Sequence, residues 1–185
     1  MLFKRKTITI HRLNSPVQHD DHLQAYPEST IELVEYGDYQ NPYCVHANSM
    51  VKMLQQNFGK NLRFAFRHFP MSTVNDFALP AALAAEAAHR QDKFWEMHDL
   101  IFDKQDYLNE YALIEFAMQL RLRLTTFKKD LLDPALAKKV KADFDSGISS
   151  GVKDAPTFFI NGEKYTGDLD YVSLAEAMIE RHNII

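Results

Sequence analysis

The chain has 185 residues, a formal net charge of -4 and 46% hydrophobic residues. That length supports one sizeable core with room for an inserted subdomain, and not two typical domains. The negative net charge gives no sign of the basic surface that nucleic-acid binding needs. No apolar run approaches the roughly eighteen residues that a membrane span requires.

The N-terminal segment and the single cysteine indicate where in the cell the protein is expected to be. A basic cluster stands at Lys4, Arg5 and Lys6, without the apolar block and small-residue cleavage site of a secretory signal. Cys44 is the single cysteine, so no disulfide can form within the chain, which fits a reducing compartment. We therefore expect a cytoplasmic location.

The first half of the chain predicts strand, helix, strand. Thr7–Ile10 has the composition of a short strand, and the segment from Ser15 to Pro27 has that of a loop. The run 31–36 is apolar and β-branched, as in a buried strand, and 62–69 alternates with period two as far as Pro70. Between them, Asn41 suits a helix N-cap and Pro42 a first helical position, with Gly59 as the stop. A helical connection of this length implies a right-handed crossover between parallel strands.

The second half predicts several helices, then a hairpin and a last helix. The predicted helices span 78–89, 94–102, 111–120, 126–132 and 134 to about 144. Thr157–Ile160 is followed by Asn161-Gly162 and by 163–166, which is a strong hairpin signal because a type I′ turn needs positive φ at both central residues. Residues 173–181 close the chain as a helix.

This order predicts one α/β domain in four parts. Residues 1–28 form an N-terminal extension and strand, 29–70 a first half, 71–150 a helical insert, and 151–185 a second half.

Four motifs stand at the corners of this pattern. They are Leu33-Val34-Glu35-Tyr36-Gly37-Asp38-Tyr39, Phe64-Ala65-Phe66-Arg67-His68-Phe69-Pro70, Lys93-Phe94-Trp95-Glu96-Met97-His98-Asp99-Leu100, and Ala155-Pro156-Thr157-Phe158-Phe159-Ile160-Asn161-Gly162. Together they resemble the DsbA family of thiol-disulfide oxidoreductases over roughly residues 15–180. The resemblance implies a thioredoxin-like fold whose helical insert separates the strand-helix-strand half from the hairpin-helix half.

The resemblance also places a candidate site. The family's Cys-x-x-Cys motif falls on Asn41-Pro42-Tyr43-Cys44, so Cys44 stands at the second cysteine and Asn41 replaces the first, which is the attacking one. Pro156 matches the family's cis-proline, and Ala155 precedes it. Asn41 and Cys44 are thus the candidate catalytic positions, and Pro42, Tyr43, Ala155 and Pro156 the candidate substrate-binding positions.

The residues at this site limit its chemistry. Disulfide exchange needs an attacking thiolate and a second thiol that resolves the mixed disulfide. The helix N-terminus that lowers the pKa of an attacking thiol here holds Asn41, which cannot ionise. Dithiol exchange by the family mechanism is therefore excluded for the monomer, and we expect a degenerate site that keeps a groove for a peptide or thiol.

Two enzymatic alternatives stay open. Cys44 could act as a monothiol toward glutathione or a partner protein, although an inward-facing cysteine is more often a small core residue. Asn41 could instead donate a hydrogen bond to a glutathione thiolate in a transferase or isomerase. The expected partners are a thiol-containing protein, a peptide or glutathione, which is the one possible cofactor; no nucleic acid or membrane is expected.

Other polar residues favour structural roles. His46 would point about 200° away from Cys44 on a helix, so the two do not form a dyad. His19-Asp20-Asp21-His22 has metal-ligand residue types, but its position in a predicted surface loop without a further ligand argues against a metal. Glu35 and Asp38 flank the turn, where the family keeps a proton-transfer carboxylate; because no attacking thiol is present here, solvation or a salt bridge is at least as strongly expected for them. His68 is expected to be a core or edge residue, and Phe94, Trp95 and His98 to pack the insert.

Overall fold

The structure is a computed structural model that describes residues 11–182. Its strands are β1 (His22–Gln24), β2 (Ile31–Gly37), β3 (Leu62–His68), β4 (Thr157–Ile160) and β5 (Glu163–Lys164). Its α-helices are α1 (Pro42–Phe58), α2 (Ala78–His89), α3 (Phe94–Asp103), α4 (Glu110–Gln119), α5 (Leu124–Asp130), α6 (Pro134–Ser149) and α7 (Tyr171–His182). Two short 3₁₀ turns, η1 (Gly59–Asn61) and η2 (Gln105–Tyr107), complete the described elements.

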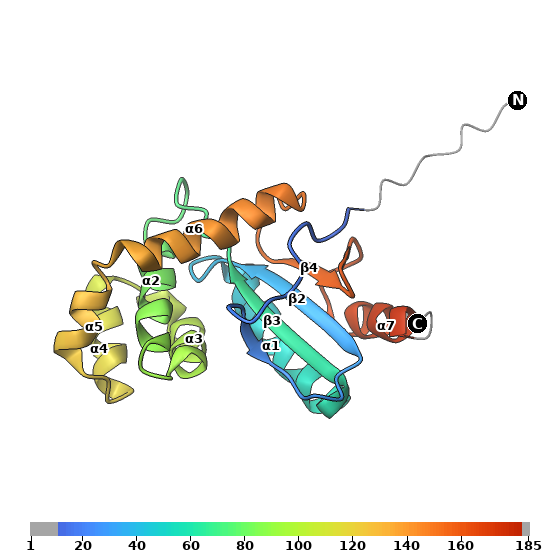
Figure 1. Ribbon diagram of the computed structural model, residues 1–185, viewed down its shortest axis with the longest axis horizontal. Helices are drawn as coiled ribbons and strands as arrows, with labels where there is room; N and C mark the ends of the chain where they lie inside the picture. The colour runs from blue at the N-terminus through green and yellow to red at the C-terminus, as the bar shows by residue number, and fades with distance from the viewer. Residues whose placement is uncertain (1–10, 183–185) are drawn as a thin grey trace, which may run out of the picture.

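One mixed sheet organises the molecule, with strand order β1-β3-β2-β4-β5 (Figure 1). Strands β2 and β3 are parallel, with Leu33 opposite Phe64, whereas β1, β4 and β5 pair antiparallel to their neighbours. Strands β2 and β3 are buried on both faces along most of their length, and this includes the charged residues Glu35 and Arg67.

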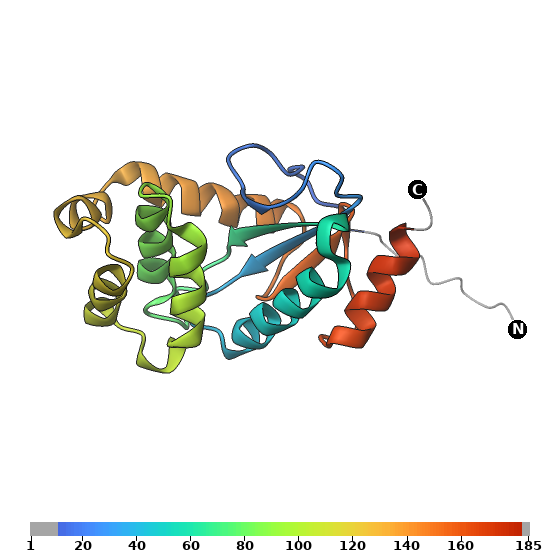
Figure 2. The ribbon, with the colours of Figure 1, turned by 90° about the horizontal axis from the view of Figure 1, so that it is seen from below.

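Helices cover both faces of the sheet (Figure 2). Helices α1 and α7 lie together on one face, and α6 crosses the other, where it contacts β3. Helices α2 to α5 form a separate layer beyond one end of the sheet. The architecture is the thioredoxin-like α/β fold with a helical insert that the sequence predicts.

The local signals of the two halves are confirmed. Strands β2 and β3 are joined through α1 and run parallel. Strands β4 and β5 form a hairpin whose turn has φ of 48° at Asn161 and 78° at Gly162, so both central residues adopt the positive φ that a type I′ turn requires.

The prediction of a loop from Ser15 to Pro27 was wrong in part. His22–Gln24 form β1, which pairs antiparallel with β3 and places His22 opposite Phe66. Three residues are too few to show a period-two pattern, so the pairing comes from the neighbouring strand rather than from local sequence. The strand predicted at Thr7–Ile10 lies outside the described residues.

Two helices are longer than predicted. Helix α6 continues to Ser149, and the Ser149 hydroxyl donates a hydrogen bond to the carbonyl oxygen of Asp145 one turn earlier. Helix α7 begins at Tyr171 because Asp170 accepts hydrogen bonds from the backbone N–H and the hydroxyl of Ser173. The other predicted helix boundaries differ from the structure by two residues or fewer.

Between residues 11 and 182, no helix combines the length and the apolar character that crossing a bilayer would need. The division of the chain into residues 1–28, 29–70, 71–150 and 151–185 stays a prediction.

Candidate functional site

Asn41 caps helix α1 at the carboxyl end of β2. Its backbone is extended, with φ of -84° and ψ of 121°, and its Oδ1 accepts a hydrogen bond of 2.9 Å from the backbone N–H of Tyr43. Pro42 then occupies the first helical position, as predicted. The side chain therefore satisfies one of the donors that would otherwise attract an anion at this helix terminus.

The other end of the Asn41 amide reaches the proline loop. Its Nδ2 donates a 2.7 Å hydrogen bond to the carbonyl oxygen of Ala155, and the Ala155–Pro156 peptide bond is cis. The backbone N–H of Ala155 donates to Oδ1 of Asp154 at 2.8 Å. Both backbone groups that an extended peptide would pair with at Ala155 thus already have partners inside the chain.

The remaining predicted site residues lie on the outer side of this contact. Tyr43 is 67% exposed, Pro42 is exposed and Pro156 is half-buried. The structure thus brings Asn41 together with Ala155 as predicted, and it leaves an exposed aromatic ring beside them.

Cys44 faces the protein interior. Its side chain has no exposed surface, and its Sγ accepts a long contact of 3.4 Å from the backbone N–H of Asp38. Burial, reinforced by the nearby carboxylate of Glu35, raises the pKa of the Cys44 thiol well above its ordinary value. A buried thiol of this kind is neither a nucleophile at neutral pH nor accessible to a partner.

Glu35 is a buried carboxyl group of β2 in the same region. Burial raises its pKa to about 8, and its Oε1 has no hydrogen-bond partner among the described residues. A carboxyl group with such a pKa is protonated at neutral pH. It is the strongest candidate for the family's buried proton-transfer carboxylate, although this chain offers no attacking thiol for it to serve.

Asp38, the other acidic residue of the turn, has a structural role. Its Oδ1 accepts from the backbone N–H of Gln40 at 2.7 Å, and its Oδ2 accepts from the N–H of Met71 at 2.9 Å and from Nδ2 of Asn75 at 2.8 Å. Asp38 therefore joins the turn before α1 to the loop after β3. It does so by hydrogen bonding, not through the salt bridge or solvation that the sequence suggested.

The helical insert also contacts the turn between β2 and α1. Nε2 of Gln105, in η2, donates to the carbonyl oxygens of Tyr39 and Asn41 at 2.8 and 3.0 Å. The Tyr39 hydroxyl lies 3.0 Å from Nδ1 of His98, on α3. The insert thus contacts the segment that presents Asn41, a role that no sequence motif revealed.

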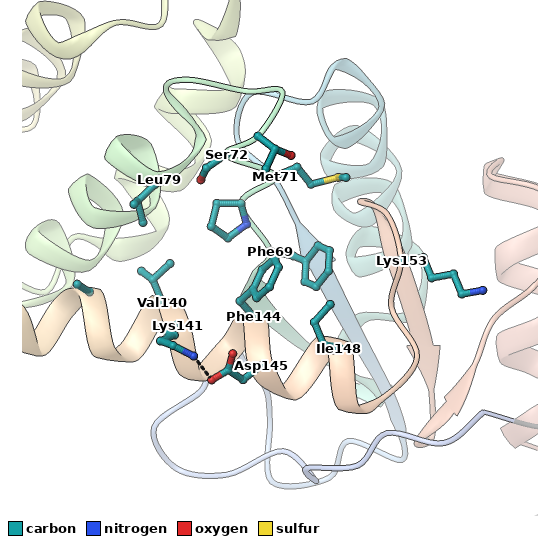
Figure 3. A pocket seen from close by; sticks show the side chains of 13 residues that line it. Phe69, Met71, Ser72, Leu79, Val140, Lys141, Phe144, Asp145, Ile148 and Lys153 are labelled. Atoms are coloured by element: carbon teal, nitrogen blue, oxygen red, sulfur yellow. Dashed lines mark hydrogen bonds and ion pairs between the residues drawn. The ribbon is translucent and has the colours of Figure 1, made fainter.

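An apolar recess lies between α6 and the loop that follows β3 (Figure 3). Its volume is about 510 Å³, and the stacked rings of Phe69 and Phe144 form part of its wall. Lys153, two residues before Ala155, stands at its edge.

The histidines have different environments. His46 is exposed on α1, and His68 is fully buried. Phe94, Trp95 and His98 belong to one aromatic cluster, which agrees with a packing role. The segment 19–22 is only partly a surface loop: Asp21 binds the buried Arg67 through two hydrogen bonds of 2.7 and 2.8 Å, and His22 is buried.

Comparisons with known proteins identify the family. The family model Thioredoxin_4, described as Thioredoxin, matches residues 18–180. The chain belongs to this thioredoxin family. Its fold is that of the DsbA-type thiol-disulfide oxidoreductases, as the structures of similar proteins show.

Two solved structures illustrate the likeness in fold. Oxidised BdbD from Bacillus subtilis gives a TM-score of 0.77 at 24% identity, covering 87% of this chain and 92% of that one. A thioredoxin-like oxidoreductase from Silicibacter pomeroyi gives 0.78 at 22% identity, covering 95% and 97%.

A curated relative is longer than this chain. The Na(+)/H(+) antiporter NhaA 1 of Salinispora arenicola is 39% identical over 164 residues, covering 88% of this chain and 25% of the relative. The chain therefore spans about a quarter of the length of the curated relatives that it matches.

The burial of Cys44 leads to a testable prediction. In the native protein, a soluble thiol reagent such as Ellman's reagent should label Cys44 far more slowly than in urea-unfolded protein, because the buried thiol is not ionised. The labelling rate is measured by absorbance across pH 6–9. A fast native reaction with an apparent pKa below about 8.5 would contradict this assignment and support the monothiol route.

Proposed function

We propose that this chain is a redox-silent, DsbA-like thioredoxin-fold domain that binds extended segments of thiol-containing proteins without exchanging their disulfides. The observation that supports the proposal is the pair of hydrogen bonds by which Asn41, at the position that the family resemblance assigns to the attacking thiol, joins the α1 terminus to the carbonyl of Ala155. With Cys44 buried beneath it, no thiol faces the binding surface.

Two surfaces support the binding role. The exposed ring of Tyr43 offers an aromatic contact of the kind enriched in interfaces. The apolar recess beside Lys153 offers a floor for apolar side chains of an extended segment. Because Asn41 and Asp154 already bind the backbone of Ala155, we expect side-chain contacts to contribute more than strand addition at this loop.

The test combines an activity assay with a binding assay. Wild-type protein should not accelerate insulin reduction by dithiothreitol, and it should bind fluorescein-labelled reduced insulin B chain in a polarisation titration. Tyr43→Ala should weaken that binding by about tenfold, which corresponds to roughly 1.4 kcal/mol for one interface aromatic.

Tyr111→Ala provides the matched control, because Tyr111 is an 86% exposed tyrosine on α4. It should leave binding unchanged. Catalysis of insulin reduction by the wild type would refute the redox-silent assignment, and equal effects of the two tyrosine variants would refute the binding surface.

The geometry of Asn41 supports glutathione chemistry less well than it supports peptide binding. Asn41 commits one N–H of its amide to Ala155, so only the second N–H is left for a thiolate. The monothiol alternative would need Cys44, which is buried. Calorimetry that shows no glutathione binding at millimolar concentration would remove the first of these.

The longer relatives suggest a second candidate function. Since this chain matches about a quarter of proteins named as Na(+)/H(+) antiporters, we infer that the domain can act alongside such a transporter. Co-purification with an antiporter expressed in the same cells tests this association. A cytoplasmic location stays part of the proposal.

A further inference from the structure

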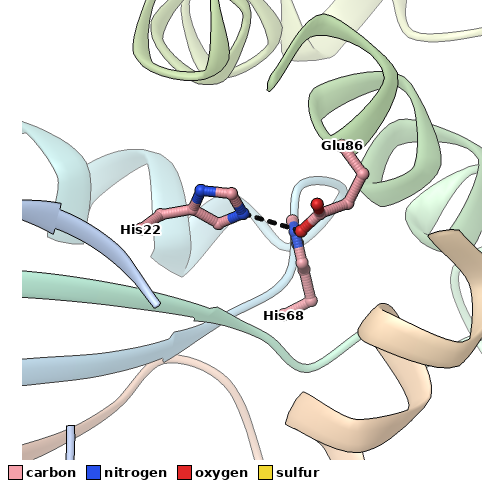
Figure 4. A group of neighbouring side chains, drawn as sticks. All are labelled: His22, His68 and Glu86. Carbon is pink, nitrogen blue, oxygen red and sulfur yellow. Dashed lines mark hydrogen bonds and ion pairs between the residues drawn. The ribbon is translucent and has the colours of Figure 1, made fainter. Parts of the chain in front are cut away.

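Three side chains with metal-ligating atoms meet inside the protein. They are His22 on β1, His68 at the end of β3 and Glu86 on α2 (Figure 4). His22 Nε2 lies 2.7 Å and His68 Nε2 lies 2.9 Å from the same oxygen, Oε1 of Glu86. The exposed fractions of the three residues are 5%, 0% and 3%.

We propose that His22, His68 and Glu86 form a buried binding site for a divalent transition-metal cation of the zinc type. Two imidazole nitrogens and one carboxylate are a donor set that binds Zn²⁺ with a further ligand in the fourth position. The three ligand atoms already lie within 4.8 Å of one another. With metal–ligand bonds of about 2.0–2.1 Å, tetrahedral donors stand roughly 3.3 Å apart, so the carboxylate has to withdraw from each imidazole by about half an ångström.

The charge of the cluster favours a cation. The ion-pair contacts of Glu86 within the described residues are those with the two histidines. The nearby ammonium of Lys139 instead binds Asp143 at 2.6 Å. A buried carboxylate without a fixed cationic partner is unfavourable, and a bound divalent ion would compensate it.

Ring orientation and tautomer also permit coordination. His22 stacks on Phe94 with ring centroids 3.4 Å apart and an interplanar angle of 9°, which fixes the direction of Nε2. Nδ1 of His68 is buried and has no hydrogen-bond partner among the described residues. Moving the His68 proton from Nε2 to Nδ1 would free Nε2 for a metal, but it would leave a buried N–H without an acceptor among the described residues, a cost that the metal–nitrogen bond has to exceed.

The sequence argued against a metal near His22 because it placed 19–22 in a loop without a further ligand. The fold supplies two ligands from positions 46 and 64 residues further along the chain. A metal here would link the edge strand β1, the central strand β3 and the insert helix α2.

The experiment uses Co²⁺ as a spectroscopic probe and Zn²⁺ as a competitor. The full chain is stripped with a chelator, unfolded, and refolded with either ion so that the buried site can load. We expect one Co²⁺ per chain with visible absorption of a four-coordinate N/O site, displacement by Zn²⁺, and a higher midpoint of thermal unfolding. His22→Gln and Glu86→Gln should each weaken binding by at least about 100-fold, beyond the 10–100-fold typical of losing a supporting contact.

His46→Gln is the control for exposed histidines and should bind Co²⁺ as the wild type does. Circular dichroism checks that each variant folds. If the wild type refolds and binds no Co²⁺ or Zn²⁺, the cluster is a hydrogen-bonded core and the proposal is overturned. Binding of wild-type strength in a folded His22→Gln or Glu86→Gln variant, or loss of binding in His46→Gln, would overturn it as well.

Discussion

Asn41→Cys is expected to convert this chain into a dithiol protein. The new thiol would stand at the N-terminus of α1, three residues before Cys44, where unpaired N–H groups stabilise a thiolate and typically lower its pKa to about 3.5–7.5. Insulin reduction, which we expect to be absent in the wild type, should become readily measurable. Alkylation after oxidation should also show an intramolecular disulfide between positions 41 and 44.

Asn41→Ser is the matched control, because serine also caps a helix but cannot exchange disulfides. Combining Asn41→Cys with Cys44→Ala should permit mixed disulfides and abolish turnover, since no resolving thiol remains. If folded Asn41→Cys protein showed neither a disulfide nor activity, the site has diverged beyond the loss of one residue. The interpretation of Cys44 as the remaining cysteine of a Cys-x-x-Cys pair would then be contradicted.

Glu35→Gln is expected to flatten the dependence of stability on pH. The pKa of Glu35 is about 8 in the folded protein against an ordinary value of 4.5, so between these values the folded protein keeps a proton that the unfolded chain has lost. The free energy of unfolding therefore falls as pH rises from about 4.5 to about 8. At 1.36 kcal/mol per pKa unit, this single group accounts for about 3–5 kcal/mol.

Urea unfolding at pH 5 and pH 8 measures the effect. The wild type should lose stability between the two values by about 3–5 kcal/mol more than Glu35→Gln does, because the amide does not ionise. Comparing the two pH values within each variant cancels any constant cost of burying the amide. Glu176→Gln, at an exposed position of α7, should retain the wild-type slope. Parallel slopes for Glu35→Gln and wild type would show that Glu35 ionises normally.

Local sequence signals predicted most of the architecture. Asn41 and Pro42 mark the start of α1, and Asn161-Gly162 marks the hairpin, because each signal acts on the backbone of its own neighbours. The candidate site was placed by resemblance at the α1 terminus and the proline loop. The structure brings these segments together through the hydrogen bond from Asn41 to Ala155.

What could not be predicted depends on contacts between distant segments. Strand β1 exists because β3 offers it an edge, and three residues carry too weak a pattern of their own. His22 belongs to the histidine–carboxylate cluster only once β1 has formed, and Glu86 lies 64 residues away in an alanine-rich helix. Likewise, no local sequence signal predicts the hydrogen bond from the Asn41 amide to the carbonyl oxygen of Ala155.

The two hydrogen bonds from Gln105 have a mechanical consequence. One amide nitrogen on η2 holds the carbonyls of Tyr39 and Asn41, immediately ahead of α1. A partner that displaced η2 would loosen the cap of α1 without touching it. The insert therefore contacts the segment before α1 through Gln105 as well as through the Tyr39–His98 contact, and displacement of η2 would remove two of the hydrogen bonds that support the α1 terminus.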